Sequence, residues 1–201
     1  MSSVTARIKE IKQPRNGYLK ISEFNVKTLK DNRILNENEN IHASVIGMTV
    51  DYMTRFIMGV GLLDAFKISI IGASFAEKIG LKNTIKEINE YLKGIKGLDD
   101  ASIINACKMV TFDVWYRNPF AAMKAKTAQN TNPNAETIEN IKILIERSLE
   151  FWKKYGPIKV DGFTFENGGY TDKVNSGDGD FLTEDTLWDF KVSKAKPKKD
   201  H

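Results

Sequence analysis

The sequence predicts an α+β protein: a helical block followed by a small mixed or antiparallel β-sheet of restriction-endonuclease-like type. Two observations support this fold class. Apolar residues recur at helical spacing between residues 35 and 156. After Pro157 the pattern changes to short apolar runs separated by Gly, Asn and Asp, which is typical of strands and turns. We therefore expect one domain with an N-terminal arm (1–34), a helical region (35–156) and a sheet (157–201).

The predicted helices occupy residues 36–61, 62–80, 84–93, 101–117 and 132–156. Gly59 and Gly61 should end the first helix. Asn83 and Thr84, with Glu87 three residues after Thr84, form a capping-box signal for the third helix, and Asp99 or Asp100 can cap the fourth helix. The last helix has the clearest apolar stripe, made of Ile138, Ile141, Leu144, Ile145, Leu149 and Trp152. Before these helices, residues 6–12 alternate weakly, and residues 17–26 form a short strand or an arm.

The composition excludes several classes of protein. Hydrophobic residues make up 41% and charged residues 28% of the 201-residue chain, as in a soluble globular protein. No apolar run reaches the length of a membrane span, and the charged first thirty residues do not form a signal peptide. The single cysteine, Cys107, excludes an internal disulfide, a zinc cluster and an iron–sulfur cluster, and we expect it to be a small core residue. A cytoplasmic location follows.

The charge balance favours polyanionic partners only mildly. The net charge is +4, and five lysines lie in the last eleven residues, KVSKAKPKKDH. This basic segment is either a solvated tail or a set of phosphate contacts beside a site.

Residues 177–191, GDGDFLTEDTLWDFK, are the most informative stretch. If residues 178–183 and 186–192 pair around a four-residue loop, 182 faces 187, 181 faces 188, and Asp180 faces Asp189. Side chains repeat every two residues along a strand, so Lys191 shares the face of Asp189. The opposite face is apolar and suits a core; it carries Phe181, Trp188, Phe190 and Val192.

The two facing carboxylates need an explanation, because opposed like charges destabilise a strand pair. Leu182 and Leu187 flank the acids and indicate partial burial, which makes unpaired charge costlier. The acids are therefore solvated, or one is protonated, or a cation lies between them. Mg²⁺ is commonly held by one or two carboxylates, with water and substrate phosphate completing its coordination. A nearby lysine could orient or deprotonate water, so hydrolysis of a phosphodiester is the chemistry that the cation alternative implies.

Asp180 together with Asp189-Phe190-Lys191 resembles the signature of the PD-(D/E)XK nuclease superfamily. The preceding Gly177-Asp178-Gly179-Asp180 resembles the G-x-x-D motif of its RecB-like exonuclease branch. The resemblance covers residues 157–201. It implies Mg²⁺ or Mn²⁺ bound by Asp180, Asp189 and the backbone carbonyl of Phe190, with Lys191 as the catalytic lysine. It also implies DNA as substrate and a role in phage, mobile-element or DNA-repair biology.

The family often adds a ligand from a helix that precedes the sheet. His42, Glu37, Glu39 and Asp51 are the candidates here, and we favour Asp51 because its neighbours are apolar. The alternative for Asp51 is an i,i+4 salt bridge with Arg55, and residues 113 and 117 form a second such pair. His42 is more readily explained as a helix-surface or core histidine.

The chain departs from the family after the lysine strand. Only ten residues follow Lys191, whereas the family usually continues with a helix bearing a Gln-x-x-x-Tyr-like motif and a further strand. The sequence thus predicts an incomplete nuclease core that could require a missing segment or a protein partner. The alternative function is a non-catalytic nucleic-acid-binding or assembly protein on the same fold, and a purely structural helical domain is a third option.

Overall fold

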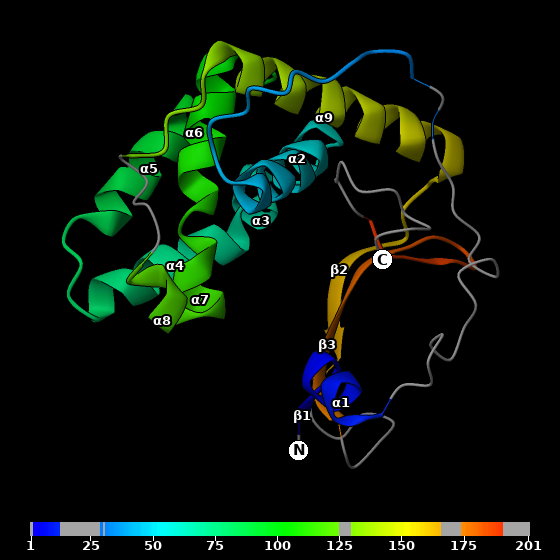
Figure 1. The fold of residues 1–201 in the computed structure, drawn as a ribbon, viewed down its shortest axis with the longest axis horizontal. Helices are drawn as coiled ribbons and strands as arrows, with labels where there is room; N and C mark the ends of the chain where they lie inside the picture. Colours follow the sequence, from blue (N-terminus) through cyan, green and yellow to red (C-terminus); the bar gives the residue numbers. More distant parts are fainter. Residues whose placement is uncertain (1, 13–28, 30, 125–129, 166–173, 191–201) are drawn as a thin grey trace. The chain divides into compact units, whose positions relative to one another are not determined.

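The structure is a computed structural model that describes residues 2–12, 29, 31–124, 130–165 and 174–190. It contains two compact units (Figure 1). The helical unit is Lys30–Glu150, and the sheet unit combines Met1–Leu29 with Phe151–His201. The predicted α+β class is confirmed. The first residues of the chain group with the sheet unit, so the boundaries of the units differ from those drawn on the sequence.

The helical unit contains seven helices and most of an eighth within the described residues (Figure 1). They are α2 (Ala43–Ile57), α3 (Leu62–Ala65), α4 (Lys67–Lys78), α5 (Thr84–Gly94), α6 (Asp100–Val110), α7 (Asp113–Arg117), α8 (Pro119–Ala122) and α9 (Ala135–Tyr155). The last five residues of α9 belong to the sheet unit. None of the helices in the described ranges is long and apolar enough to cross a membrane.

Two predicted helices are each divided in the structure. The helix expected over 62–80 breaks at Phe66, whose side chain is fully buried and meets the Tyr52 ring edge-on at 5.5 Å. The helix expected over 101–117 breaks between Val110 and Asp113. Gly72 of α4 approaches this second break so closely that an added Cβ would lie 2.0 Å from the carbonyl oxygen of Phe112. Tertiary packing therefore determines where both helices end.

The caps of α5 and α6 differ in how well the sequence predicts them. Asp99 caps α6 as expected, because its Oδ1 accepts the amide of Ser102 at 3.0 Å. The capping box predicted for α5 is wrong: Thr84 lies within the helix, and its hydroxyl donates to the carboxylate of Glu77 at 3.0 Å. The same Glu77 oxygen accepts the amide of Ile85 at 2.8 Å. A carboxylate from the neighbouring helix α4 thus replaces the local cap.

The core of the helical unit is apolar and tightly closed. Its fully buried large side chains come from α2, α5, α6 and α9 and from the α3–α4 break, and include Val50, Met53, Phe66, Ile88, Ile103, Met109, Ile141 and Ile145. Cys107 is also fully buried, as predicted, and burial raises the pKa of its thiol to about 11. Such a thiol is inert, since the thiolate is the reactive form.

Residues 31–42, the tethered segment, contain neither helix nor strand. Side chains of α9 make the hydrogen bonds to the backbone of this segment that a helix or a strand would otherwise supply. Asn140 accepts the amide of Asn36 at 2.8 Å and donates to its carbonyl at 2.9 Å, and Thr137 accepts the amide of Asn40 at 3.1 Å. Asn140 is fully buried, so these bonds form where water cannot substitute for them.

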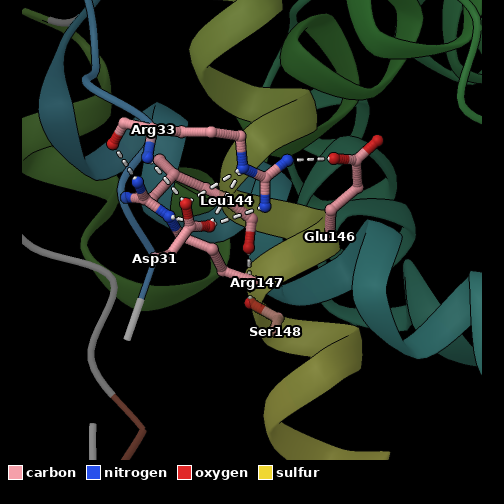
Figure 2. Close-up of polar contacts among 6 residues, drawn as sticks. All are labelled: Asp31, Arg33, Leu144, Glu146, Arg147 and Ser148. Atoms are coloured by element: carbon pink, nitrogen blue, oxygen red, sulfur yellow. Dashed lines mark hydrogen bonds and ion pairs between the residues drawn. The ribbon is translucent and has the colours of Figure 1, made fainter. Parts of the chain in front are cut away.

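Charged residues hold the start of the tethered segment (Figure 2). Asp31 accepts hydrogen bonds from Arg33 at 2.7 Å and from Arg147 of α9 at 2.8 Å, and Arg33 also pairs with Glu146. The hydrogen bonds from Arg33 and then Arg147 hold the pKa of Asp31 well below its usual range. The carboxylate therefore stays ionised while this network is intact.

The sheet unit is built around β3 (Val174–Leu182). Within the described residues the sheet has four strands: β3 pairs antiparallel with β2 (Val160–Phe165) and with β4 (Leu187–Trp188), and parallel with β1 (Ser2–Ser3). The weak alternation of residues 6–12 does not correspond to a strand, because α1 (Val4–Glu10) is helical. The strand or arm expected over residues 17–26 lies outside the described residues.

Aromatic side chains form the core of the sheet unit. Phe151, Trp152 and Phe181 are buried, and Tyr155, Trp188 and Phe190 pack against them. Their ring centroids lie 4.7–5.9 Å apart in edge-to-face and tilted pairs. This cluster joins the end of α9 to one face of the β3–β4 hairpin. The edge-to-face arrangement of the rings stabilises these aromatic pairs beyond simple burial.

Candidate functional site

The β3–β4 hairpin has the register that the sequence predicts. Phe181 pairs with Trp188 and Leu182 pairs with Leu187. Residues 183–186 form the connection, and the amide of Thr183 donates to the carbonyl of Thr186 at 3.0 Å. The four-residue loop and the two pairs beside it are therefore confirmed, whereas the predicted pairing of Asp180 with Asp189 is not part of this ladder, which ends at Trp188.

The two faces of the hairpin differ as expected. Phe181, Trp188 and Phe190 all belong to the aromatic cluster. The indole N–H of Trp188 donates to the hydroxyl of Thr183 at 2.9 Å, which fixes the ring against the loop. Because successive side chains alternate across a strand, Asp180 of β3 lies on the face opposite Phe181.

Asp180 is half-buried at the end of the paired region. Its Oδ2 accepts the backbone amide of Phe190 at 2.8 Å. The paired residues of β4 end at Trp188, so Asp189 lies just beyond the ladder, between Trp188 and the residue that Asp180 binds. The Asp180 carboxylate is thus held beside the backbone that carries Asp189.

The position across from Asp180 on β2 carries no side chain. The pairs Asp161–Phe181 and Phe163–Gly179 bracket Gly162 and Asp180, so these two residues oppose each other. Gly162 has φ +59°, a conformation that favours glycine. The absence of a Cβ leaves the site face open next to the carboxylate, a feature that the sequence analysis did not identify.

The expected partial burial of both acids is only half right. Asp189 is exposed, and Leu187 is 64% exposed, so the leucines do not enclose the site face. The reason is that the aromatic cluster covers only the opposite face of the hairpin. The charge of Asp189 is consequently open to water. Lys191, the predicted catalytic lysine, lies outside the described residues.

The candidates for an additional ligand have other contacts in the helical unit. Asp51 pairs with Arg55 at 3.1 Å, the i,i+4 salt bridge that was the alternative explanation. Glu39 accepts the side-chain amide of Asn140 at 2.8 Å. His42 is the N-cap of α2, where its Nδ1 accepts the amide of Ser44. Glu37 is exposed. The role of Asp51 as a metal ligand stays a prediction.

Asp113 is a buried acid whose environment the sequence analysis missed. Its side chain is 1% exposed and accepts hydroxyl hydrogen bonds from Tyr52 of α2 and Ser69 of α4, both at 2.5 Å. The predicted pair with Arg117 is present, with Nε 3.7 Å from the carboxylate. Burial raises the pKa of Asp113, although these hydrogen bonds and the charge of Arg117 oppose that shift. No local pattern identifies the two hydroxyl partners.

The hairpin supplies ligands of the kind that suit a hard divalent cation. The carboxylates of Asp180 and Asp189 and the backbone carbonyl of Phe190 are oxygen donors of the type that Mg²⁺ and Mn²⁺ accept. A carboxylate has about four lone-pair sites, so the bond from the Phe190 amide does not exhaust Asp180. Within the described ranges, no group of three or more His, Cys, Asp or Glu residues could hold a metal.

Comparison with known proteins adds no assignment: no protein-family model matches the chain, and neither the curated proteins nor the solved structures contain a significant match.

Proposed function

We propose that the chain is a metal-dependent phosphodiesterase acting on DNA, with the PD-(D/E)XK type of site in a restriction-endonuclease-like sheet. Asp180, Asp189 and the Phe190 carbonyl would hold Mg²⁺ or Mn²⁺. Lys191 would activate the attacking water or stabilise developing charge. Asp51 is the candidate for a further ligand.

The observation that carries this proposal is the hairpin register. The aromatic side chains pack on one face of the hairpin, and the alternation of side chains along β3 leaves Asp180 for the other face. In the proposed site Asp189 shares the face of Asp180. The hydrogen bond from the Phe190 amide then orients Asp180 toward the backbone beside Asp189.

The residues have separable roles in the proposed reaction. Asp180 is the pre-oriented carboxylate, because the backbone amide of Phe190 in the facing segment donates a hydrogen bond to it. Asp189 is the exposed carboxylate and can meet a phosphate-bound ion from solvent. Gly162 keeps the neighbouring position on β2 free of a side chain, which gives a phosphodiester access. A bound divalent ion would supply Lewis acidity and lower the pKa of a coordinated water.

DNA cleavage in Mg²⁺ or Mn²⁺ tests the proposal. We expect divalent-dependent cleavage of plasmid and end-labelled linear DNA, reduced by at least about 100-fold in Asp180→Asn, Asp189→Asn and Lys191→Ala. Asparagine is chosen because its carbonyl still accepts the Phe190 amide at position 180. Asp185→Asn, at the exposed tip of the same hairpin, is the matched control and should retain activity.

A binding measurement separates the metal site from turnover. Mn²⁺ should quench the tryptophan fluorescence of the chain, since Trp152 and Trp188 belong to the cluster behind the hairpin. Asp180→Asn and Asp189→Asn should abolish the quenching, whereas Asp185→Asn should not. Cleavage that survives all three site substitutions, or Mn²⁺ quenching that survives both aspartate substitutions, would refute the proposal.

A second candidate is a non-catalytic nucleic-acid-binding or assembly protein on the same fold. The observation that favours it is the exposure of Asp189. An exposed acid beside a half-buried one can simply be solvated. This candidate predicts salt-sensitive DNA binding, or binding of a protein partner, without divalent-dependent turnover and without loss in the aspartate variants.

A further inference from the structure

The helical unit carries an apolar surface that its own core does not use. It is made of six large side chains with exposed fractions of 37–82%, from α4, α7, α8 and their caps: Ile71, Phe75, Ile79, Tyr116, Phe120 and Met123. We call these six residues the apolar face. Its parts are neighbours, because α7 packs on α4 and on α8 (Figure 1).

The α4 part of the apolar face is a regular stripe. Ile71, Phe75 and Ile79 follow one another at four-residue spacing, so they lie on one side of the helix. Gly72 brings α7 against this helix: a Cβ at Gly72 would lie 3.5 Å from the backbone nitrogen of Tyr116. The α7 end of the apolar face is thereby held beside the α4 stripe.

The apolar face is large for a surface with no partner. The six exposed fractions add up to about 3.2 fully exposed residues, which at about 200 Å² each gives roughly 650 Å². The largest apolar patch on a typical monomer is about 300–600 Å², and a standard protein–protein interface buries about 800 Å² on each side. The size therefore indicates an interaction surface.

The charges around the apolar face are mostly basic. Lys67, Lys78, Arg117 and Lys124 are exposed on or next to these helices. Asp64, just before α4, and Glu77 of α4 are exposed acids, and the Glu77 carboxylate already caps α5. A partner with acidic groups around an apolar centre would complement this distribution, because complementary charge steers and orients association.

We infer that the apolar face binds an amphipathic helix of a protein partner, with an apolar stripe and acidic flanks. A helix fits because i±4 ridges such as the α4 stripe pack into the grooves of another helix. In a dimer formed through this face, the basic residues around one apolar face would lie against those of the other copy and repel them. Phe120 and Met123 are 82% and 66% exposed and could enter a lipid surface, but the three residues of the α4 stripe are only 37–45% exposed, which suits packing against a helix better than insertion into lipid. The inference does not depend on the hairpin site.

A designed peptide pair tests the inference directly. The first probe is a labelled helix of about five turns, with leucines at positions i, i+3, i+4 and i+7 and glutamates elsewhere. The second probe replaces every glutamate by lysine. We expect the full chain to bind the acidic peptide at least about tenfold more tightly than the basic one, with binding that weakens as salt increases.

Variants of the chain localise the binding. Phe75→Ser combined with Phe120→Ser should weaken binding of the acidic peptide at least about tenfold, as expected for aromatic anchors. Ile34→Ser is the matched control, because Ile34 is 91% exposed in the same unit but lies on the tethered segment. The far-UV circular dichroism of each variant should match that of the parent chain, which separates lost binding from lost folding.

Three outcomes would overturn the inference. Equal binding of the two peptides, or equal loss in Ile34→Ser, would remove the proposed specificity. Binding to vesicles of anionic lipid that is lost in the double serine variant, without peptide binding, would assign the apolar face to membranes. Self-association in sedimentation that the same variant abolishes, again without peptide binding, would assign it to a second copy.

Discussion

Removal of the buried carboxyl of Asp113 should destabilise the helical unit strongly. Asp113 accepts hydrogen bonds from Tyr52 and Ser69, so one side chain of α7 joins hydroxyl groups of α2 and α4. Asp113→Ala would leave both hydroxyls without this acceptor inside the core. Asp113→Asn would keep an acceptor oxygen, and a hydroxyl can accept from its new amide as well as donate.

The expected loss of stability follows from the number of buried hydroxyl groups that lose their hydrogen-bond acceptor. A buried polar group that loses its partner costs about 1–3 kcal/mol. Asp113→Ala leaves two buried hydroxyl groups without a hydrogen-bond acceptor, but it also removes the cost of burying the carboxyl group. Together these effects should lower the free energy of unfolding by about 2–4 kcal/mol. Arg117 contributes little, since its side chain is 55% exposed. For Asp113→Asn we expect a loss of about 1 kcal/mol.

The effect of pH has a definite sign. Burial raises the pKa of Asp113, so the folded chain holds this proton more tightly than the unfolded chain does. The resulting stabilisation is complete below the ordinary pKa of about 3.9 and is lost as pH rises through the raised value. Asparagine does not titrate. The stability difference between the parent chain and Asp113→Asn should therefore be larger at low pH and shrink as pH rises.

Urea unfolding followed by far-UV circular dichroism at several pH values measures both quantities. Asp64→Ala, which removes an exposed aspartate of the same unit, is the control and should change the free energy of unfolding by less than about 0.5 kcal/mol. The reasoning fails if Asp113→Ala costs no more than this control. A difference between the parent chain and Asp113→Asn that does not vary with pH would also refute it.

Two further substitutions test the packing of α4 and the charge network of the tethered segment. Gly72→Ala should lower the free energy of unfolding by about 1–3 kcal/mol, because its Cβ would lie 2.0 Å from the Phe112 carbonyl oxygen and the backbone must shift. Gly97→Ala, where nothing lies within 4 Å, should be nearly neutral in the same urea assay, and equal losses would contradict this account. Asp31→Asn should be destabilising at pH 7, because the lowered pKa of Asp31 gives stability that is present above its unfolded pKa and lost as pH falls through the folded value. The difference between Asp31→Asn and the parent chain should close in acid, and a difference that stays constant with pH would argue against the network.

Local patterns predicted the hairpin well. The two-residue period of a strand and the length of the loop together fix the register, so the pairing of Phe181 with Trp188 could be derived without tertiary information. The same pattern identified the aromatic face. The exposure of Asp189 could not be derived, because it depends on which face the end of α9 covers.

Helix boundaries could be predicted where the signal is local. Asp99 caps α6 through a residue three positions away, and such a contact can be recognised in the sequence. The break at Phe66 depends on its burial against Tyr52 of α2, and the break before Asp113 depends on packing between α4 and α7, which lie far apart in the chain. The partners of Asp113 are 44 and 61 residues away, so only its i,i+4 pair with Arg117 could be predicted.

The tethered segment has a consequence for the order of folding during synthesis. Its contacts with α9 and the residues just before that helix join positions 92–116 residues apart. A ribosome adds about 5–20 residues per second, so these partners follow the segment by on the order of 5–20 s. Until then, the amides of Asn36 and Asn40 can be satisfied only by water. Closing this long loop is therefore the late step of the helical unit, and helices α2–α8 must remain soluble before it occurs.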